Sequence, residues 1–437
     1  MKTVLKNAHL VLPEETKHGD LLIEDGLIAT IGGSIDAPGA EEIDCSDKWV
    51  LPGVIDAHVH FRSPGYEYKE DWETGSKAAL AGGVTTVFDM PNTKPQTTTA
   101  ETLKSKRALA RKGSLVNFGL FLGATGENID VINEAEGIVG VKVYMGQTTG
   151  QEIADPDEAL DTMLRDLFER THRVIAVHAE DETQIRKHMK TYKGEEFPEI
   201  HSLIRNDSVA YTAARRAVHI AKKYSGRLHI CHLSTKKEVA LLAKYTDDNI
   251  TAEVAPHHLF FTVSDYAQRG TLLKMNPPLR SHADVDALWE ALIDGSIPMI
   301  ATDHAPHLKK EKLRGYWDAP AGVPGVEMVL PLLLDSVHEK MLDIHQVVSL
   351  LCEGPARVYG VKNKGRLREG YDADLAVVDM DMMRTVHNER VMSKCGWTPY
   401  DGMDVRGWPI MTFVGGRLMM ENGSIVSGHN GREVELV

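Results

Sequence analysis

Two histidines separated by a single residue stand in the segment "DAHVHFRSPG", residues 56–65. Alternate side chains of a β-strand point to the same face, so His58 and His60 can bind one metal ion together. Two partly buried histidines that bond to backbone carbonyls would give the same pattern. The pair alone therefore leaves a metal site and a packing role equally open.

Three more candidate metal ligands end other strand-like runs. They are His178 in "VIAVHAE", His232 in "LHICHLS" and Asp303 in "PMIATDH". If these runs are parallel strands of one barrel, their carboxyl ends meet on one face, where the loops build the active site. So many candidate ligands on separate strands are difficult to attribute to packing, and we predict that they share a metal centre.

Lys142 lies among valines in the strand-like run "GIVGVKVYMGQ". A charged amine in such a place is costly to bury unless it is paired or neutralised. A snorkelling side chain or a salt bridge to a buried acid would solve this, and so would reaction with CO2 to give a carbamate. The other candidate ligands favour a carbamate that bridges two divalent ions. Zinc is the predicted metal, and cobalt, manganese and iron remain compatible with these ligands.

Such a centre would carry out hydrolysis, or its reversal, at an amide-like carbon. Two ions would hold a bridging hydroxide at neutral pH and polarise a neighbouring carbonyl. Asp303 is both a candidate ligand and a neighbour of that hydroxide, so we predict that it is the catalytic acid and base.

The elements that position these residues alternate between strands and amphipathic helices from about residue 55 to residue 359. About eight such units predict an α/β fold, a (β/α)8 TIM-type barrel. A doubly wound open sheet is the alternative, but no GxGxxG motif follows the first strand. Short strands at both ends predict a small β-sandwich built from the two termini. The expected boundaries are 1–54 and 363–437 for the sandwich and 55–362 for the barrel, whose Gly/Pro-rich loop 308–325 is a candidate lid.

Composition narrows the possible partners. The chain of 437 residues has a net charge of −14, which argues against non-specific binding to nucleic acid or to an anionic membrane. No apolar run is long enough to span a bilayer or to form a secretory signal. The four cysteines are widely spaced, as expected for reduced thiols. We therefore expect a cytoplasmic enzyme with a small-molecule substrate and, because two-fold dimers are the commonest oligomers, a homodimer.

Nearly the whole chain resembles the cyclic amidohydrolases of the amidohydrolase superfamily, and among them the dihydroorotase family. The resemblance is densest in "DAHVHFRSPGYEYKED", "FDMPNTKPQT", "VKVYMGQT", "EVAPHHLFF", "MNPPLR", "ATDHAPH" and "GVPGVEMVLPLLL". It implies that the metal ligands are His58, His60, carbamylated Lys142, His178, His232 and Asp303, and that two zinc ions are bound. It implies substrate contacts at Arg62, Asn92, Asn276 and His307, with Asp303 as the general acid and base.

The implied reaction is the reversible cyclisation of N-carbamoyl-L-aspartate to dihydroorotate and water, in pyrimidine synthesis. Arg62 suits this substrate because a guanidinium pairs with a carboxylate through two hydrogen bonds. The backbone around Gly322, in "APAGVPG", can read a ureide. From the residues alone, Arg62 is also compatible with an ordinary ion pair, and Asn92 and Asn276, next to prolines, with turns.

One variable feature of the family favours the lysine. Some bacterial relatives have an aspartate in a "DDG"-like loop where others use the carbamylated lysine. The loop "KVYMGQTTG" of this chain carries Lys142 and no such acid.

Two other functions compete with this prediction. An allantoinase or another ureide-ring amidohydrolase would share the barrel and the ligands, but its substrate would lack the carboxylate that Arg62 is expected to bind. A catalytically silent scaffold for another pyrimidine enzyme would be expected to have lost ligands, and this chain keeps all six.

Overall fold

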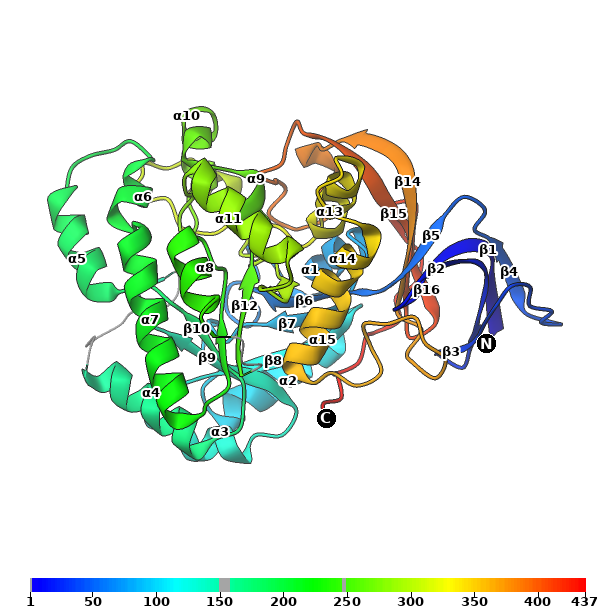
Figure 1. Cartoon of the computed structure of the whole chain (residues 1–437), viewed down its shortest axis with the longest axis horizontal. Coiled ribbons are helices and arrows are strands. Elements are labelled where there is room, and N and C mark those ends of the chain that lie inside the picture. Colours follow the sequence, from blue (N-terminus) through cyan, green and yellow to red (C-terminus); the bar gives the residue numbers. More distant parts are fainter. Residues whose placement is uncertain (1, 149–157, 246–248) are drawn as a thin grey trace.

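The computed structural model describes residues 2–148, 158–245 and 249–437 (Figure 1). Within these residues, eight parallel strands form one sheet with the order β13-β12-β11-β10-β9-β8-β7-β6. Their bounds are β6 (Val54–Val59), β7 (Val84–Asp89), β8 (Asn117–Gly123), β9 (Ile138–Tyr144), β10 (Ile175–His178), β11 (Leu228–Ile230), β12 (Ile250–Val254) and β13 (Met299–Ile300).

The two edges of this sheet meet. The backbone amide of His60, after β6, donates to the carbonyl of His304, after β13, at 2.8 Å. The amide of Thr302 donates to the carboxylate of Asp56 at 3.0 Å. The predicted barrel is therefore confirmed, and the open-sheet alternative is wrong, because an open sheet leaves its edge strands unpaired.

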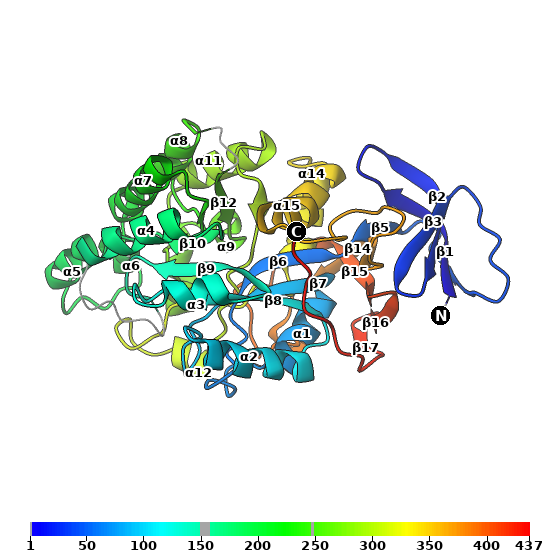
Figure 2. The ribbon, with the colours of Figure 1, turned by 90° about the horizontal axis from the view of Figure 1, so that it is seen from below.

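Helices cover the outside of the barrel (Figures 1 and 2). Those that follow the first four strands are α1 (Trp72–Ala81), α2 (Ala100–Gly113), α3 (Ile129–Glu134) and α4 (Glu158–Arg170). Those that follow β10 and β11 are α5 (Glu182–Thr191), α6 (Ile200–Ile204), α7 (Asp207–Tyr224) and α8 (Lys236–Leu242). The remainder are α9 (His257–Phe260), α10 (Tyr266–Arg269), α11 (His282–Ile293), α12 (Lys309–Lys312), α13 (Val329–His338), α14 (Ile344–Val348) and α15 (Gly354–Tyr359).

The barrel strands are buried on both faces, as in other parallel sheets, and the two faces differ in what they contact. Val141, Val143 and Val177 belong to the core cluster between the strands and the helices. Ala176 and Cys231 belong to the cluster that fills the barrel. The alternation of side chains along β9 and β10 therefore directs Lys142 and His178 toward the inside of the barrel.

Strands from both termini form a second sheet, which in the described residues has nine strands (Figure 1). From the N-terminus come β1 (Lys2–Val11), β2 (Thr16–Glu24), β3 (Leu27–Gly32), β4 (Glu41–Asp44) and β5 (Trp49–Pro52). From the C-terminus come β14 (Leu375–Thr385), β15 (Asp404–Val414), β16 (Arg417–Glu421) and β17 (Ser424–Ile425). β5 pairs with both β1 and β14, so it joins the two terminal segments.

This sheet folds over a core of its own. The backbone of Ile28, in the edge strand β3, bonds to Gly370 and Tyr371, which precede β14 in the middle of the strand order. Apolar residues of both halves, including Leu21 and Phe413, pack in one cluster. The small β-domain predicted from both termini is therefore present.

The last residues of the chain leave this domain. Residues 431–436 run back along the barrel, where Val434 pairs with Phe118 of β8 and packs inside the barrel cluster (Figure 2). The barrel and the β-domain are thus joined by the contacts of this C-terminal segment as well as by the covalent links between them.

Candidate metal centre and substrate pocket

His58, His60 and Asp303 meet at the mouth of the barrel. Asp303 Oδ1 lies 2.9 Å from His60 Nε2 and 3.3 Å from His58 Nε2. One ligand atom from each of the three residues lies within 4.8 Å of the other two. The structure therefore brings together three of the six residues that the sequence predicted as ligands.

The remaining three predicted ligands line the same cavity of about 30 Å³. His178 Nδ1 faces His232 Nε2 at 3.0 Å. Lys142 is 1% exposed, and its Nζ lies 2.9 Å from Cys231 Sγ. Among the described residues, Lys142 forms no ion pair with an acid, so the buried salt bridge considered from the sequence is not found there.

The outward nitrogens of these histidines are held by oxygen atoms. His58 Nδ1 lies 2.5 Å from Glu253 Oε1, and His178 Nε2 lies 3.0 Å from Glu180 Oε2. Because carboxylates only accept, these nitrogens carry the protons and the opposite nitrogens present lone pairs to the cavity. The sequence reasoning missed both glutamates. The role of Glu253 depends on which strands lie opposite each other in the barrel, whereas Glu180 follows its histidine by only two residues.

A histidine lone pair that faces a carboxylate or a second imidazole nitrogen is bridged either by a proton or by a metal cation. His58 Nε2 faces Asp303, and His178 Nδ1 faces His232, whose own Nδ1 has no partner in the part of the chain that the structure describes. Imidazole nitrogen and carboxylate oxygen are the ligands that zinc prefers. The residues present therefore fit a divalent metal centre.

The electrostatics of the site agree with this. Burial and Lys142 disfavour a charge on His58, but Glu253 and Asp303 outweigh them and raise its pKa to about 10. Burial also opposes ionisation of Asp303, yet His58 and His60 hold the pKa of its carboxyl group well below the usual range. A field that attracts a proton to His58 will also attract a metal cation.

The backbone is strained at three of the predicted residues. Arg62, His232 and Asp303 have φ angles of 61°, 38° and 47°, in the left-handed region that side chains rarely adopt. Such conformations persist where surrounding contacts hold them, and they gather at functional sites. Each of the three follows directly after a barrel strand or close to it, where a sharp turn aims the side chain at the cavity.

Arg62 lies beside the candidate metal centre, where it forms no ion pair with an acid of the described residues. It is 4% exposed, and its Nε donates to the Pro306 carbonyl at 3.2 Å. His307 Nδ1 accepts from Lys69 Nζ at 2.9 Å, so His307 Nε2 carries the proton and donates to the Ala321 carbonyl at 3.1 Å. Arg62 Nη2 lies 3.2 Å from that same Nε2. Both atoms are donors, so they do not form a hydrogen bond with each other. This corner of the cavity is rich in donors and cations.

The predicted amide contacts and the glycine line the same cavity. Asn92 Oδ1 lies 2.6 Å from His60 Nδ1. Asn276 Oδ1 lies 2.9 Å from His201 Nε2, and Asn276 Nδ2 donates to Thr148 Oγ1 at 3.3 Å. At Gly322, with a φ of 139°, an added Cβ atom would lie 2.5 Å from the carbonyl oxygen of Ala305. Only glycine fits there without moving the backbone.

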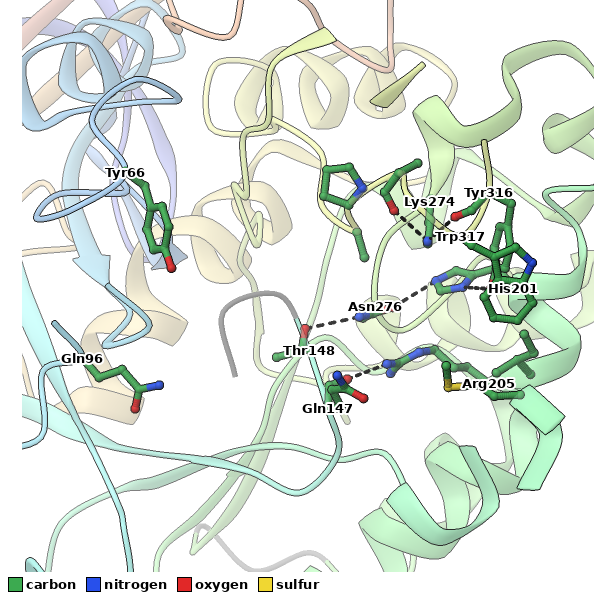
Figure 3. A pocket seen from close by; sticks show the side chains of 15 residues that line it. Tyr66, Gln96, Gln147, Thr148, His201, Arg205, Lys274, Asn276, Tyr316 and Trp317 are labelled. Atoms are coloured by element: carbon green, nitrogen blue, oxygen red, sulfur yellow. Dashed lines mark hydrogen bonds between the residues drawn. The ribbon is translucent and has the colours of Figure 1, made fainter. Parts of the chain in front are cut away.

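A wider cavity of about 680 Å³ opens outside this one (Figure 3). The two share Thr148, Asn276 and Ala321. The loop 308–325 that we predicted as a lid forms part of its wall, where Lys274 Nζ donates to the carbonyls of Tyr316 and Ala319. The outer cavity is therefore an entrance to the candidate metal centre.

Tyr144 is another lining residue that the sequence reasoning missed. It stands two positions after Lys142 on β9 and lines the inner cavity. Its hydroxyl is buried and has no hydrogen-bond partner among the described residues. The period of two in a strand could have pointed to it, since it places Tyr144 on the same face as Lys142.

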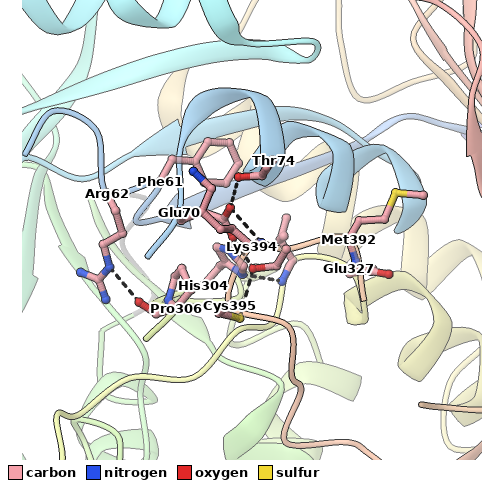
Figure 4. A network of polar contacts seen from close by, with 12 residues as sticks. Phe61, Arg62, Glu70, Thr74, His304, Pro306, Glu327, Met392, Lys394 and Cys395 are labelled. Carbon is pink, nitrogen blue, oxygen red and sulfur yellow. Dashed lines mark hydrogen bonds and ion pairs between the residues drawn. The ribbon is translucent and has the colours of Figure 1, made fainter. Parts of the chain in front are cut away.

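A buried network braces the segment next to the predicted catalytic aspartate (Figure 4). Glu70 accepts from the hydroxyls of Thr74 and Ser393 and from the backbone amide of Lys394. His304 Nε2 lies 3.5 Å from Glu70 Oε2, and its Nδ1 accepts from the amide of Gly325 at 3.1 Å. The segment between β14 and β15 thus reaches the end of the barrel that carries the candidate metal centre.

Comparison with known proteins identifies the family. Residues 49–419 match the model of the amidohydrolase family. The chain belongs to that family. A dihydroorotase of Halobacterium salinarum is 40% identical to this amidohydrolase over 430 residues, which cover 95% of this chain and 98% of the relative.

Other relatives agree on the family and differ in their substrates. A dihydroorotase of Methanothermobacter thermautotrophicus is 37% identical over 419 residues, 94% of this chain and 93% of its own. The solved L-hydantoinase (dihydropyrimidinase) of Arthrobacter aurescens has a TM-score of 0.94 at 31% identity and covers 99% of both chains. The resemblance predicted from the motifs is confirmed, and this amidohydrolase is a hydrolase.

Two further findings concern membrane-spanning helices and the cofactor. No described helix combines the length and the apolar character needed to cross a membrane. Amidohydrolases depend on metal ions, and this one has side chains grouped as metal ligands.

Proposed function

We propose that this amidohydrolase is a dihydroorotase, which interconverts N-carbamoyl-L-aspartate with dihydroorotate and water. The observation that carries the proposal is Arg62, a buried guanidinium that forms no ion pair with an acid in the described residues and lies beside the candidate metal centre. A buried cation of this kind calls for an anionic ligand, and the carboxylate of dihydroorotate supplies one. The dihydroorotases among its relatives support the same substrate.

We further propose that six residues hold two zinc ions, bridged by the carbamate of Lys142. The other five ligands are His58, His60, His178, His232 and Asp303. When bound, divalent ions polarise a carbonyl and make water a nucleophile at neutral pH. The buried amine of Lys142, which forms no ion pair with an acid among the described residues, supports the carbamate. An increase in the mass of the protein by one CO2 that is lost in acid would test it.

The chain's own residues then divide the work. Arg62, with Asn92, Asn276 and His307, binds the carboxylate and the ring through hydrogen bonds, and the backbone around Gly322 completes the pocket. In the hydrolytic direction Asp303 accepts a proton from the attacking water through its carboxylate oxygen. The ring C–N bond breaks as Asp303 returns that proton to the leaving nitrogen. Cyclisation follows the same steps in reverse and releases one water.

The proposal also includes the oligomeric state, the localisation, the partners and the domain boundaries. We propose a homodimer in the cytoplasm that binds neither nucleic acid nor membranes, with domain boundaries at 1–54, 55–362 and 363–437. Analytical ultracentrifugation at micromolar concentration tests the dimer, and a monomer at all concentrations would contradict it.

The second candidate is a hydantoin- or allantoin-ring hydrolase. The hydantoinase structure that superposes over nearly the whole chain favours it. These rings carry no carboxylate, so they would leave Arg62 buried and unpaired.

A substrate panel decides between the candidates. Purified protein loaded with zinc and bicarbonate is assayed with dihydroorotate, dihydrouracil, hydantoin and allantoin. We expect dihydroorotate to have the highest kcat/KM, because only this ring carries the carboxylate. Turnover of hydantoin or allantoin without dihydroorotate would overturn the assignment, and a protein that retains no metal and turns over none of the four would be the silent scaffold.

A further inference from the structure

Asn276 stands where the inner and outer cavities meet, and the direction of its amide group matters for binding. It lines both the 30 Å³ cavity and the 680 Å³ entrance. An amide presents either two N–H donors or an oxygen acceptor to a ligand. A carboxylate is attracted by the first orientation and repelled by the second.

His201, in α6, settles which orientation is present (Figure 3). Its Nε2 lies 2.9 Å from the backbone carbonyl of Met275, and a carbonyl only accepts, so Nε2 carries the proton. The same N–H lies 2.9 Å from Asn276 Oδ1. The amide oxygen therefore faces His201, and the amide nitrogen faces the other way.

Tyr316 holds the other side of the ring. Its hydroxyl lies 3.0 Å from His201 Nδ1, the nitrogen without a proton, and donates to it. His201 is 3% exposed, and burial, with Lys274 nearby, lowers its pKa well below the usual value, so the ring is neutral. The ring is thus fixed in one tautomer by a donor on one side and acceptors on the other.

The contact with His201 excludes the reversed amide, because that orientation would place an Asn276 N–H group against the His201 N–H group. Thr148 Oγ1, 3.3 Å from Asn276 Nδ2, fits either orientation, since a hydroxyl both donates and accepts. In the observed orientation Asn276 Nδ2 points away from His201 and offers N–H donors to the inner cavity, which Arg62 also lines.

We propose that His201 is a positioning residue that makes Asn276 a fixed hydrogen-bond donor to the substrate carboxylate, with Tyr316 holding the imidazole in place. This inference rests on the proposed function, because it needs a substrate with a carboxylate. His201 does not touch the reacting atoms and acts only through Asn276. Its effect is therefore on the recognition of the carboxylate and not on the chemical step.

A double-mutant cycle tests this directly. The metal-loaded wild type, His201→Phe, Asn276→Ala and the double variant are compared by their KM for dihydroorotate and by the Ki of dihydrouracil, the same ring without the carboxylate. We expect His201→Phe to raise the KM about tenfold, because a hydrogen bond to a charged group is weakened. The Ki and the kcat should stay nearly unchanged, and in the Asn276→Ala background His201→Phe should have no further effect.

A conservative variant gives the matched control. His201→Gln keeps an N–H donor near the position of Nε2, and the Met275 carbonyl selects that donor, so its KM should stay within about threefold of wild type. Thermal unfolding and metal content are measured for every variant. If His201→Phe does not fold, His201→Leu replaces it in the cycle.

The outcomes separate the two proposals. If the wild type does not turn over dihydroorotate, the proposed function fails and this inference fails with it. If the wild type is active but His201→Phe raises the KM equally with and without Asn276, or weakens dihydrouracil to the same extent, only the role of His201 is overturned.

Discussion

The cavity has two halves whose surroundings carry opposite charge. Around the candidate metal centre, the outward nitrogens of His58 and His178 are held by Glu253 and Glu180. Around Arg62, Lys69 bonds to the ring of His307 and pairs with Glu311 on its far side, while Arg62 itself forms no ion pair with an acid among the described residues. The first half is built to hold cations, and the second is built to hold an anion. The contrast teaches that the residues bonded to the lining side chains indicate the charge of the ligand as clearly as the lining side chains do.

The largest expected effect comes from Asp303, where the two halves meet. Asp303→Asn keeps the shape and removes the carboxylate that moves the proton, so we expect kcat/KM for dihydroorotate to fall by about 10³-fold. Metal content, measured by elemental analysis, separates loss of proton transfer from loss of the ion. Activity close to wild type with metal bound would show that another group moves the proton.

Arg62 comes next, because it defines the anionic half. Arg62→Gln should raise the KM for dihydroorotate about 100-fold, since a charge-assisted pair is lost. The Ki of dihydrouracil should hardly change. Arg314→Gln, on the exposed surface of the loop 308–325, is the matched control and should behave as wild type. Equal losses for both ligands would break the division of the cavity into two halves.

Glu253 tests the half around the candidate metal centre, because it bonds to the side of the His58 ring that faces away from the cavity. Its pKa is held well below the usual range by His58 and His229 despite its burial, so it is an anion at neutral pH. Glu253→Gln should weaken metal affinity by about 10- to 100-fold, as is usual when the partner of a ligating histidine is lost. Competition with a chelator measures this, and the exposed Glu196→Gln is the control. Unchanged affinity would mean that the carboxylate only fills space.

A change at Tyr144 should have the smallest effect on activity, and it tests a lining residue that belongs to neither the predicted metal ligands nor the predicted carboxylate contacts. Its buried hydroxyl has no partner in the described residues, so we expect it to donate to the substrate. Tyr144→Phe should lower kcat/KM for dihydroorotate about tenfold and raise the free energy of unfolding of the metal-free protein by about 1 kcal/mol. Lower stability with unchanged activity would contradict a role in binding.

The two halves also differ in how far the sequence predicts them. The candidate ligands lie in barrel strands or just after them, and strand periodicity with parallel topology places His58, His178 and Asp303 at one end without a structure. Arg62, Asn92 and Asn276 lie in loops, where no periodicity applies. Only the resemblance to a known family indicated their role.

Two of the residues that were missed share one property. Glu253 and His201 act through neighbours that are far away in the chain, such as His58, 195 positions from Glu253. A sequence pattern shows which face of its own element a residue occupies. It does not show which residue of another element lies opposite, and that depends on the register and curvature of the closed barrel.

A crystal structure of the metal-loaded protein with dihydroorotate tests the two-half account most directly. It should show metal density between the histidines and Asp303, with the substrate carboxylate within hydrogen-bond distance of Arg62 and Asn276 Nδ2. A carboxylate that points into the outer cavity, away from Arg62, would contradict the account.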